Sequence, residues 1–181
     1  MHNSLRLQLK GMLRNEVSQC LELLDHLAEL IQQLNIEVQR RALNNKSAKL
    51  LMTVPGVGYY IGLMILAEIG DVRRFPSARK LASYAGLVPT TRSSGGHTYH
   101  GRITKQGSSW LRWAAIEVAL HLTRQPGPLR RFYERQRRRK GPKIARVALA
   151  RKLLTYMYWM LRHNEPYDAQ VRRLETVGVS P

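Results

Sequence analysis

Two adjacent serines, Ser93 and Ser94, stand before a glycine pair in the stretch TTRSSGGHTYHGRITKQG, which covers residues 90–107. Glycines adopt backbone conformations closed to other residues and let a large ligand approach closely. A serine just before them would lie at the tip of a turn with its hydroxyl exposed. Because a serine without a base is a poor nucleophile, His97, His100 or a metal supplied from elsewhere would have to activate it.

Cationic side chains accompany these serines and could bind phosphate oxygens. They are Arg92, Arg102 and Lys105. Such groups could stabilise charge that develops on a phosphoryl centre. On spacing alone, a solvated Ser-Ser-Gly-Gly loop is the favoured interpretation, and catalysis by a serine is the alternative.

The overall charge indicates the class of partner. The chain of 181 residues has a net charge of +18 and a pI near 10.9. A field of that sign attracts polyanions, and nucleic acid is the commonest of them. An anionic membrane is the rival, but no apolar run reaches 18 residues and no signal peptide begins the sequence. A single cysteine, Cys20, suits a reducing compartment. We therefore expect a cytoplasmic, nucleoid-associated protein with no membrane contact.

The charge divides the chain near residues 44–47. Residues 1–50 hold 7 basic and 5 acidic side chains, whereas residues 51–181 hold 23 and 7. We predict an assembly helix over residues 1–46, a helical domain over 47–162 and a loose polar tail over 163–181. The fold class that we expect is all-α.

The near-neutral first segment carries apolar residues in an unbroken heptad spacing of four and three, typical of a coiled coil. They are Leu13, Val17, Cys20, Leu24, Leu27, Ile31, Leu34 and Val38. This seam predicts a long helix that pairs with another helix or protomer and makes a homo-oligomer. A helix packed on its own domain is the alternative.

A second pattern is the turn Pro55-Gly56-Val57-Gly58 between two apolar segments, the later one predicted to be a helix over Tyr59–Ile69. Exposed amides at Gly56 and Gly58, before a helix N-terminus, can bind a phosphate. The pattern resembles the helix-hairpin-helix DNA-binding motif, in which a small residue such as Gly62 or Ala67 faces the neighbouring helix. Contacts of this kind position DNA without reading its sequence. A structural turn with no ligand is the alternative.

Three further helices follow, over residues 78–85 with Ser77 as N-cap, from Ser108 or Ser109 to about Leu120, and over 143–161. We expect the two tryptophans of the middle helix, Trp110 and Trp113, to lie in the core. Residues 124–152 carry 12 basic side chains and one acidic. A run this dense favours binding along a nucleic-acid backbone. Its candidate contacts are Arg135, Arg137, Arg138, Arg139, Lys140 and Lys143.

No metal site can be read from the sequence. The carboxylates Glu68, Asp71, Glu117 and Glu134 are scattered, and there is neither zinc-ligand spacing nor a phosphate loop of the Walker type. We expect the chain alone to bind no metal.

Three blocks in a fixed order are more specific than any single motif. They read TVPGVGYYIGLMILAEIGDVRRFPSARKLASYAGLVP, then RSSGGHTYHGRITKQGSSWLRWAAIEVA, and, after a basic segment, ARKLLTYMYWML. In this order they resemble the C-terminal domain of the insertion-sequence-110 family of transposases, which includes the Piv-type DNA invertases.

The resemblance implies a helical domain with an essential serine that attacks a DNA phosphodiester and forms a phosphoserine intermediate. By position that serine is Ser94, with Ser93 as the fallback. Gly95 and Gly96 would shape the turn, and Arg102, Lys105 and Gly107 match the basic block that follows. The implied partners are element-end and target DNA and a structured guide RNA.

In the family, an RNase H-like domain with four acidic residues precedes the coiled coil and holds Mg²⁺. No such acidic domain can be read in these 181 residues. We therefore expect this polypeptide alone to bind DNA but to cut it poorly or not at all. The alternatives are a non-catalytic helix-hairpin-helix module that binds DNA or RNA, and a coiled-coil oligomerisation protein whose charge only confers solubility.

Overall fold

The computed structural model describes residues 12–94 and 97–176, and these residues are mostly helical, which confirms the predicted all-α class. One small antiparallel sheet interrupts the helices. In chain order the elements are α2 (Met12–Asn44), α3 (Lys46–Met52), α4 (Tyr59–Ile69), the 3-10 helix η1 (Val72–Arg74), α5 (Ala78–Tyr84), β1 (Pro89–Ser94), β2 (His97–Ile103), α6 (Ser109–Leu122), α7 (Pro128–Lys140), α8 (Pro142–His163) and α9 (Tyr167–Thr176).

The chain folds as two compact units, Met1–Arg41 and Ala42–Pro181. Helix α2 provides the described part of the first unit, and it confirms the long helix predicted from the heptads. Most of its seam residues are exposed in the single chain, for example Leu27 at 43% and Leu34 at 65%, whereas Val17 and Val38 are half-buried. Near the end of α2, Glu37 accepts hydrogen bonds from Arg40 and Arg41, which lower the pKa of its carboxyl to about 2.

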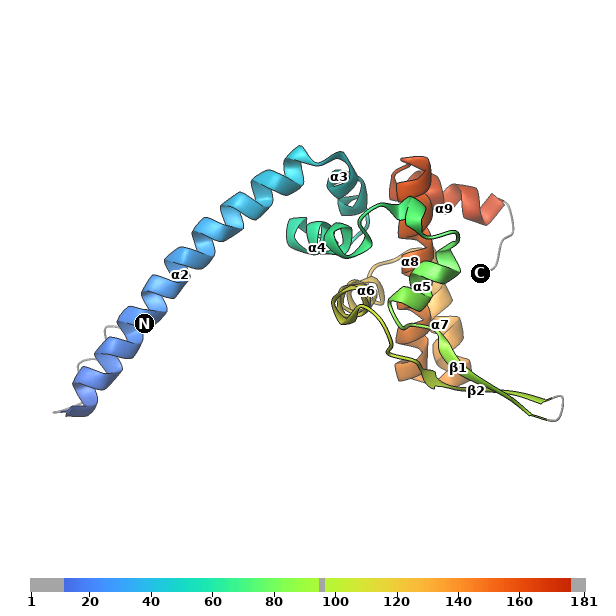
Figure 1. The fold of residues 1–181 in the computed structure, drawn as a ribbon, viewed down its shortest axis with the longest axis horizontal. Helices are drawn as coiled ribbons and strands as arrows, with labels where there is room; N and C mark the ends of the chain where they lie inside the picture. Colours follow the sequence, from blue (N-terminus) through green and yellow to red (C-terminus); the bar gives the residue numbers. More distant parts are fainter. Residues whose placement is uncertain (1–11, 95–96, 177–181) are drawn as a thin grey trace. The chain divides into compact units, whose positions relative to one another are not determined.

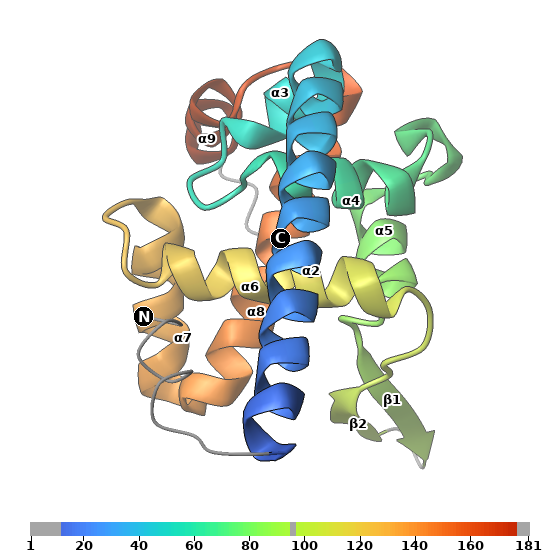
Figure 2. The same cartoon turned by 90° about the vertical axis from the view of Figure 1, so that its left-hand side faces the viewer.

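The second unit is built on α8, which lies among α3, α5, α6, α7 and α9 and contacts each of them (Figure 1). Helix α6 crosses α8, as Figure 2 shows. The side chains of Leu149, Leu153 and Met157 on α8 are fully buried in the core. Burying such apolar side chains is the main source of stability in a domain of this size. Elements far apart in sequence therefore meet on this one helix.

Helices α3 and α4 pack together across a short turn, and α4 begins and ends where the sequence predicts, at Tyr59 and Ile69. Asn45 caps α3 by accepting a hydrogen bond from the amide of Ala48. Gly62 is buried at the contact between the helices: an added Cβ would meet Met52 at 3.4 Å and the carbonyl oxygen of Ala48 at 3.7 Å. The small residue that faces the neighbouring helix is therefore Gly62, since Ala67 is exposed.

Arg74 ties the end of α4 to the next helix. Its guanidinium donates to the carbonyl oxygens of Ile69, at 2.8 Å, and Glu68, at 3.0 Å, which belong to the last turn of α4. It also lies over the rings of Phe75 and Tyr84, 4.5 and 4.8 Å from their centroids. The direction in which the chain leaves α4 and enters α5 is thereby fixed.

The structure differs from the sequence prediction at three places, of which the first concerns the serines. The solvated loop predicted around them is wrong for residues 89–94 and 97–103, which form β1 and β2. Thr90, Thr91, Thr98 and Tyr99 are β-branched or aromatic residues of the kind that favour strands. The glycine pair Gly95–Gly96 lies outside the described residues.

The tryptophans and the C-terminal segment are the other two differences. Trp110 and Trp113 are 59% and 44% exposed, so their predicted place in the core is wrong. Residues 167–176 form α9 where a loose polar tail is predicted, because Tyr167 and Val171 supply buried apolar side chains and the helix packs on α8. The predicted domain boundaries at residues 46 and 162 remain predictions.

Candidate nucleic-acid-binding site

The serine hairpin, as we call β1 and β2 over residues 89–103, extends away from the helices of the second unit (Figure 1). Its register pairs Ser94 with His97 and Ser93 with Thr98. Pro89 pairs with Ile103 at the other end, and the ladder is irregular between Pro89 and Thr91. The two predicted nucleophile positions therefore occupy the last two residues of β1, farthest from the helices.

The predicted cations of this region fall on the same hairpin or just after it. Arg92 is on β1 and Arg102 is on β2. Lys105 is exposed and follows β2 directly, with a left-handed backbone φ of 54°. Non-glycine residues adopt this conformation rarely, and then where their surroundings fix it.

Short backbone hydrogen bonds close the base of the hairpin. The amide of Thr104 donates to the carbonyl oxygen of Val88 at 2.9 Å, and the amide of Lys105 donates to that of Gly86 at 3.2 Å. The amide of Ser108 donates to the carbonyl oxygen of Tyr84 at 2.8 Å. The segments before β1 and after β2 are thus held side by side.

Ser108 joins this base to two helices. Of the two predicted candidates, Ser108 and Ser109, it is Ser108 that caps α6, and its Oγ accepts from the amide of Leu111 at 2.9 Å. The same hydroxyl donates to Glu68 Oε2 on α4, at 2.6 Å. The base of the hairpin is therefore anchored to the last turn of α4 and the first turn of α6.

The turn between α3 and α4 contains the predicted phosphate-binding residues Pro55, Gly56 and Gly58, all exposed. Gly58 is the N-cap of α4 and makes no side-chain capping bond. Gly56 has a φ of +89°, and a Cβ added there would lie 2.6 Å from His121 Cδ2. The turn therefore lies against the C-terminal end of α6, and position 56 requires glycine.

Helix α6 thus has the α3–α4 turn at one end and the base of the serine hairpin at the other. Its 14 residues span about 20 Å. An exposed stripe along it comprises Trp110, Trp113, Glu117 and His121. The two indoles lie edge to face, with ring centroids 6.4 Å apart.

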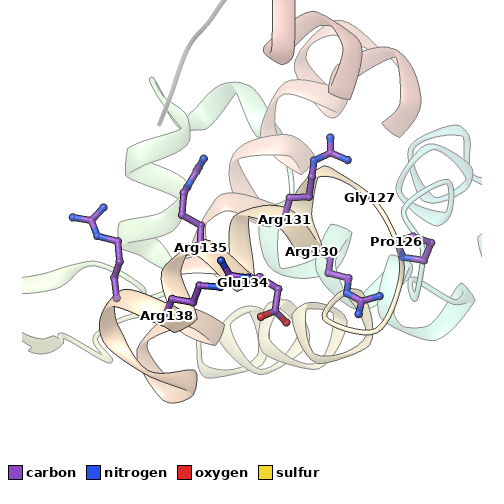
Figure 3. A pocket seen from close by; sticks show the side chains of 8 residues that line it. Pro126, Gly127, Arg130, Arg131, Glu134, Arg135 and Arg138 are labelled. Atoms are coloured by element: carbon purple, nitrogen blue, oxygen red, sulfur yellow. The ribbon is translucent and has the colours of Figure 1, made fainter.

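Helix α7 concentrates positive charge on one face. Leu129 and Tyr133 are buried toward α8, whereas the arginines of α7 are exposed. Of its 13 residues seven are basic and one, Glu134, is acidic; Glu134 pairs with Arg137 at 3.3 Å. An open hollow of about 740 Å³ on this face is lined by Pro126, Gly127, Arg130, Arg131, Glu134, Arg135, Arg138 and Arg139 (Figure 3).

The structure therefore brings the predicted basic contacts together: Arg135, Arg137, Arg138, Arg139 and Lys140 are on α7, and Lys143 is in the first turn of α8. Two lining residues, Arg130 and Arg131, were absent from the predicted contacts. The sequence spacing could have identified Arg131, because it precedes Arg135 by four residues and so lies on the same helix face.

Across residues 12–94 and 97–176, no three His, Cys, Asp or Glu side chains gather as metal ligands would. In the same part of the chain, no helix combines the length and the apolar character needed to span a membrane.

Comparison with known proteins gives a consistent picture. The sequence model described as the Transposase IS116/IS110/IS902 family matches residues 48–134. The chain is 33% identical over 146 residues to an uncharacterised 43.6 kDa protein of insertion element IS110 from Streptomyces coelicolor, covering 75% of this chain and 36% of that protein. It is 37% identical over 131 residues to the pilin gene-inverting protein of Moraxella bovis, covering 70% and 40%.

A third relative is the transposase for insertion sequence element IS1111A of Coxiella burnetii, 31% identical over 135 residues, covering 72% of this chain and 37% of that protein. The chain thus matches well under half of the length of each of these three relatives.

Proposed function

Because the chain belongs to the IS116/IS110/IS902 family of transposases, we propose that it binds DNA and supplies the serine nucleophile for strand cleavage and exchange in transposition. The DNA would comprise the element ends and the target. The proposed place of DNA binding and strand cleavage is the nucleoid, in the cytoplasm.

The observation that carries the DNA-binding part is the exposed arginine face of α7. Seven basic side chains on one helix have one acidic side chain among them, and the opposite face is fixed to α8. Neutralising phosphates with such a face releases counterions from DNA, which gives affinity without sequence readout. The turn at Gly56 adds backbone amides at the start of α4, a second arrangement suited to phosphate.

The charge-removing triple variant Arg135→Gln, Arg138→Gln and Arg139→Gln tests this role in the 181-residue chain. If each arginine contacts one phosphate, the negative slope of log affinity against log salt becomes shallower by roughly 3, at about 0.9 per lost contact. Affinity for duplex DNA should fall at least about tenfold at moderate salt. Fluorescence anisotropy with a labelled duplex at several salt concentrations measures both quantities.

The control variant removes an equal number of positive charges at exposed positions outside α7, namely Arg73, Arg79 and Lys80. This triple variant should keep most of the wild-type slope. If both variants lower the slope equally, overall charge and not the α7 face drives binding, and the proposed interface is wrong.

Strand cleavage requires a nucleophile and a proton acceptor. In the proposed reaction, Ser94 Oγ loses its proton to a base and bonds to the phosphorus, and the bond from phosphorus to a deoxyribose oxygen breaks. The register partner of Ser94 is His97, and histidine is the commonest general base; His100 is the alternative.

Mg²⁺ would be held by the carboxylates of an RNase H-like acidic domain, on the same or a separate polypeptide. The described residues of this chain do not fit such a site, since none of their acidic or histidine side chains form a group of three. The ion would stabilise charge on the phosphate, while this chain would bind DNA and present the serine. Without that acidic domain we expect little or no cleavage.

Self-association through α2 completes the proposal. Its exposed heptad seam and the near-neutral charge of residues 1–50 suit pairing with a second copy of the chain. The double variant Leu27→Glu and Ile31→Glu should convert the oligomer to a monomer, because buried charges oppose pairing. Light scattering after gel filtration measures the mass.

The matched control, Gln32→Glu with Gln33→Glu, adds two charges off the seam and should leave the mass unchanged. A wild-type chain that is monomeric at every concentration, or a seam variant that still associates, would refute pairing through this seam.

The alternative function is a non-catalytic helix-hairpin-helix module that binds DNA or RNA. The packed α3–turn–α4 arrangement, with Gly62 between the helices, favours this candidate as much as the first. The two differ in whether the hydroxyl at position 94 reacts. A structured guide RNA is a further proposed partner, and the anisotropy assay can compare RNA with DNA.

A further inference from the structure

The base of the serine hairpin is bridged by the side chain of Arg112, which lies outside the hairpin. Arg112, in the first turns of α6, donates from Nη1 to the carbonyl oxygen of Ala85 at 3.1 Å and to that of Lys105 at 3.1 Å. One acceptor precedes β1 and the other follows β2. The guanidinium therefore holds the two ends of the hairpin to α6 and to each other.

The hairpin needs such a support because an isolated pair of strands is marginally stable. The sheet of the described residues consists of β1 and β2 alone. Its position relative to the helices therefore depends on contacts at its base. These include the backbone bonds of Thr104, Lys105 and Ser108, the bond from the Ser108 hydroxyl to Glu68, and the two bonds from Arg112.

The backbone segments that face the Arg112 guanidinium leave room for it to approach. Gly86 has a φ of +67°, and a Cβ added there would lie 2.9 Å from Arg112 Nη1 and 2.6 Å from the carbonyl oxygen of Gln106. Lys105, whose carbonyl accepts one of the two bonds, has a left-handed φ of 54°. Both segments thus adopt uncommon conformations that aim carbonyl oxygens at one nitrogen. Hydrogen bonds from a charged donor are stronger than those between neutral groups.

Because the serine hairpin is long, a small change of direction at its base displaces Ser94 by a large distance. From Val88, the last residue bonded across the base, to Ser94 the chain advances six residues, about 20 Å along a strand. A tilt of about 10° at the base would move Ser94 by about 3.5 Å over that length. Misplacement of a reacting group by about 1 Å can cost about a hundredfold in rate.

We propose that Arg112 is a positioning residue for strand cleavage: it fixes the direction of the serine hairpin and thereby places Ser94 against the scissile phosphate. The inference rests on the proposed function of Ser94. Arg112 acts through the hairpin and bears no part in the chemical step itself.

The first test needs no activity and uses the 181-residue chain. Arg112→Ala should speed hydrogen exchange at the amides of Thr104 and Lys105 about tenfold or more, because their bonds close the base that Arg112 bridges. Amides in the buried middle of α8, such as those of Leu153 and Leu154, should exchange at the wild-type rate. Unchanged exchange at Thr104 and Lys105 would overturn the proposed support.

The second test uses the complete protein, with the acidic domain present, at saturating element-end DNA. Arg112→Ala should lower the single-turnover cleavage rate about 10- to 100-fold, with the DNA dissociation constant within about twofold of the wild-type value. Arg112→Lys should also be slow, because the lysine side chain is one bond shorter and its ammonium falls short of the two carbonyl oxygens that Nη1 reaches. Free guanidinium at tens of millimolar, well below denaturing concentrations, should restore part of the rate to Arg112→Ala.

Arg79→Ala, at an exposed position on α5, is the control and should cleave at the wild-type rate. A general loss of folding would lower the melting temperature and the DNA affinity together and would not respond to guanidinium. Such a result, or a wild-type rate in Arg112→Lys, overturns the inference.

Two outcomes separate this inference from the function on which it rests. If Ser94→Ala still cleaves, the proposed nucleophile is wrong, and the exchange experiment alone decides whether Arg112 holds the hairpin. If Ser94→Ala is inactive while Arg112→Ala keeps the full rate, the function stands and the positioning role is refuted.

Discussion

Ser94→Ala is expected to abolish DNA strand cleavage, by at least about a thousandfold, in a complete protein that includes the acidic domain. Alanine removes the oxygen that bonds to phosphorus in the proposed reaction. DNA affinity should change less than about tenfold, since one neutral hydrogen bond at most is lost. The measurements are cleavage of a labelled element-end duplex and anisotropy for binding.

A covalent intermediate gives a second readout of the same variant. The wild-type protein should become linked to labelled DNA and migrate with it in a denaturing gel, and Ser94→Ala should not. Ser93→Ala is the matched control, one residue away on β1, and should retain both cleavage and linkage. Loss of the adduct in Ser93→Ala alone would move the nucleophile to position 93. An adduct that survives in a chain carrying both Ser93→Ala and Ser94→Ala would exclude a serine at either position.

Gly107→Ala is expected to produce the largest loss of stability among the glycine substitutions considered. Its φ of +97° is unfavourable for alanine, and the added Cβ would meet the carbonyl oxygen of Tyr84 closer than any real contact allows. Strain and steric overlap together should lower the free energy of unfolding by about 3 kcal/mol or more. Urea denaturation followed by circular dichroism measures the change.

Gly70→Ala separates the two causes. Gly70 also has a left-handed φ, of +60°, but a Cβ there would meet nothing within 4 Å. This control should lose less than Gly107→Ala, about 1 to 3 kcal/mol, which is the cost of the backbone conformation alone. Equal losses at the two positions would mean that the contact with Tyr84 does not constrain residue 107.

Much of the helical framework could be predicted because its signals are local. Ser77 and Ser108 cap α5 and α6 as expected, each by accepting a hydrogen bond from an amide three residues later. Gly56 and Gly58 separate α3 from α4 because glycine itself permits the backbone conformations of a tight turn. Apolar periodicity located α2 and most of α8 in the same way.

The sequence predictions were wrong where tertiary contacts determine whether a residue is buried or which secondary structure it adopts. An indole has the same helical spacing whether its face of α6 is covered or open, so Trp110 and Trp113 could not be assigned to the surface from sequence. The strands of the hairpin were hidden by a polar sequence that lacks the alternation of a half-buried strand.

The candidate site shows the same division. The dense charge of residues 124–152 identified the α7 face, because composition alone carries that signal. Arg112 was not identified as functional, since its two acceptors are 27 and 7 residues away and meet only in the folded chain. The side chains of Ser93 and Ser94 lie outside the described part, and their roles remain predictions.

The central place of α8 has a consequence for synthesis on the ribosome. Helices α3, α5, α6 and α7 all pack on residues 142–163, which are made after all four of them. Tyr158 even donates a hydrogen bond to the carbonyl oxygen of Phe75, 83 residues earlier. A growing chain that ends before α8 would expose the apolar faces of α3, α5, α6 and α7 that pack on it. The second unit must therefore fold late and nearly all at once, and a premature stop before residue 142 would leave an aggregation-prone fragment in place of a smaller domain.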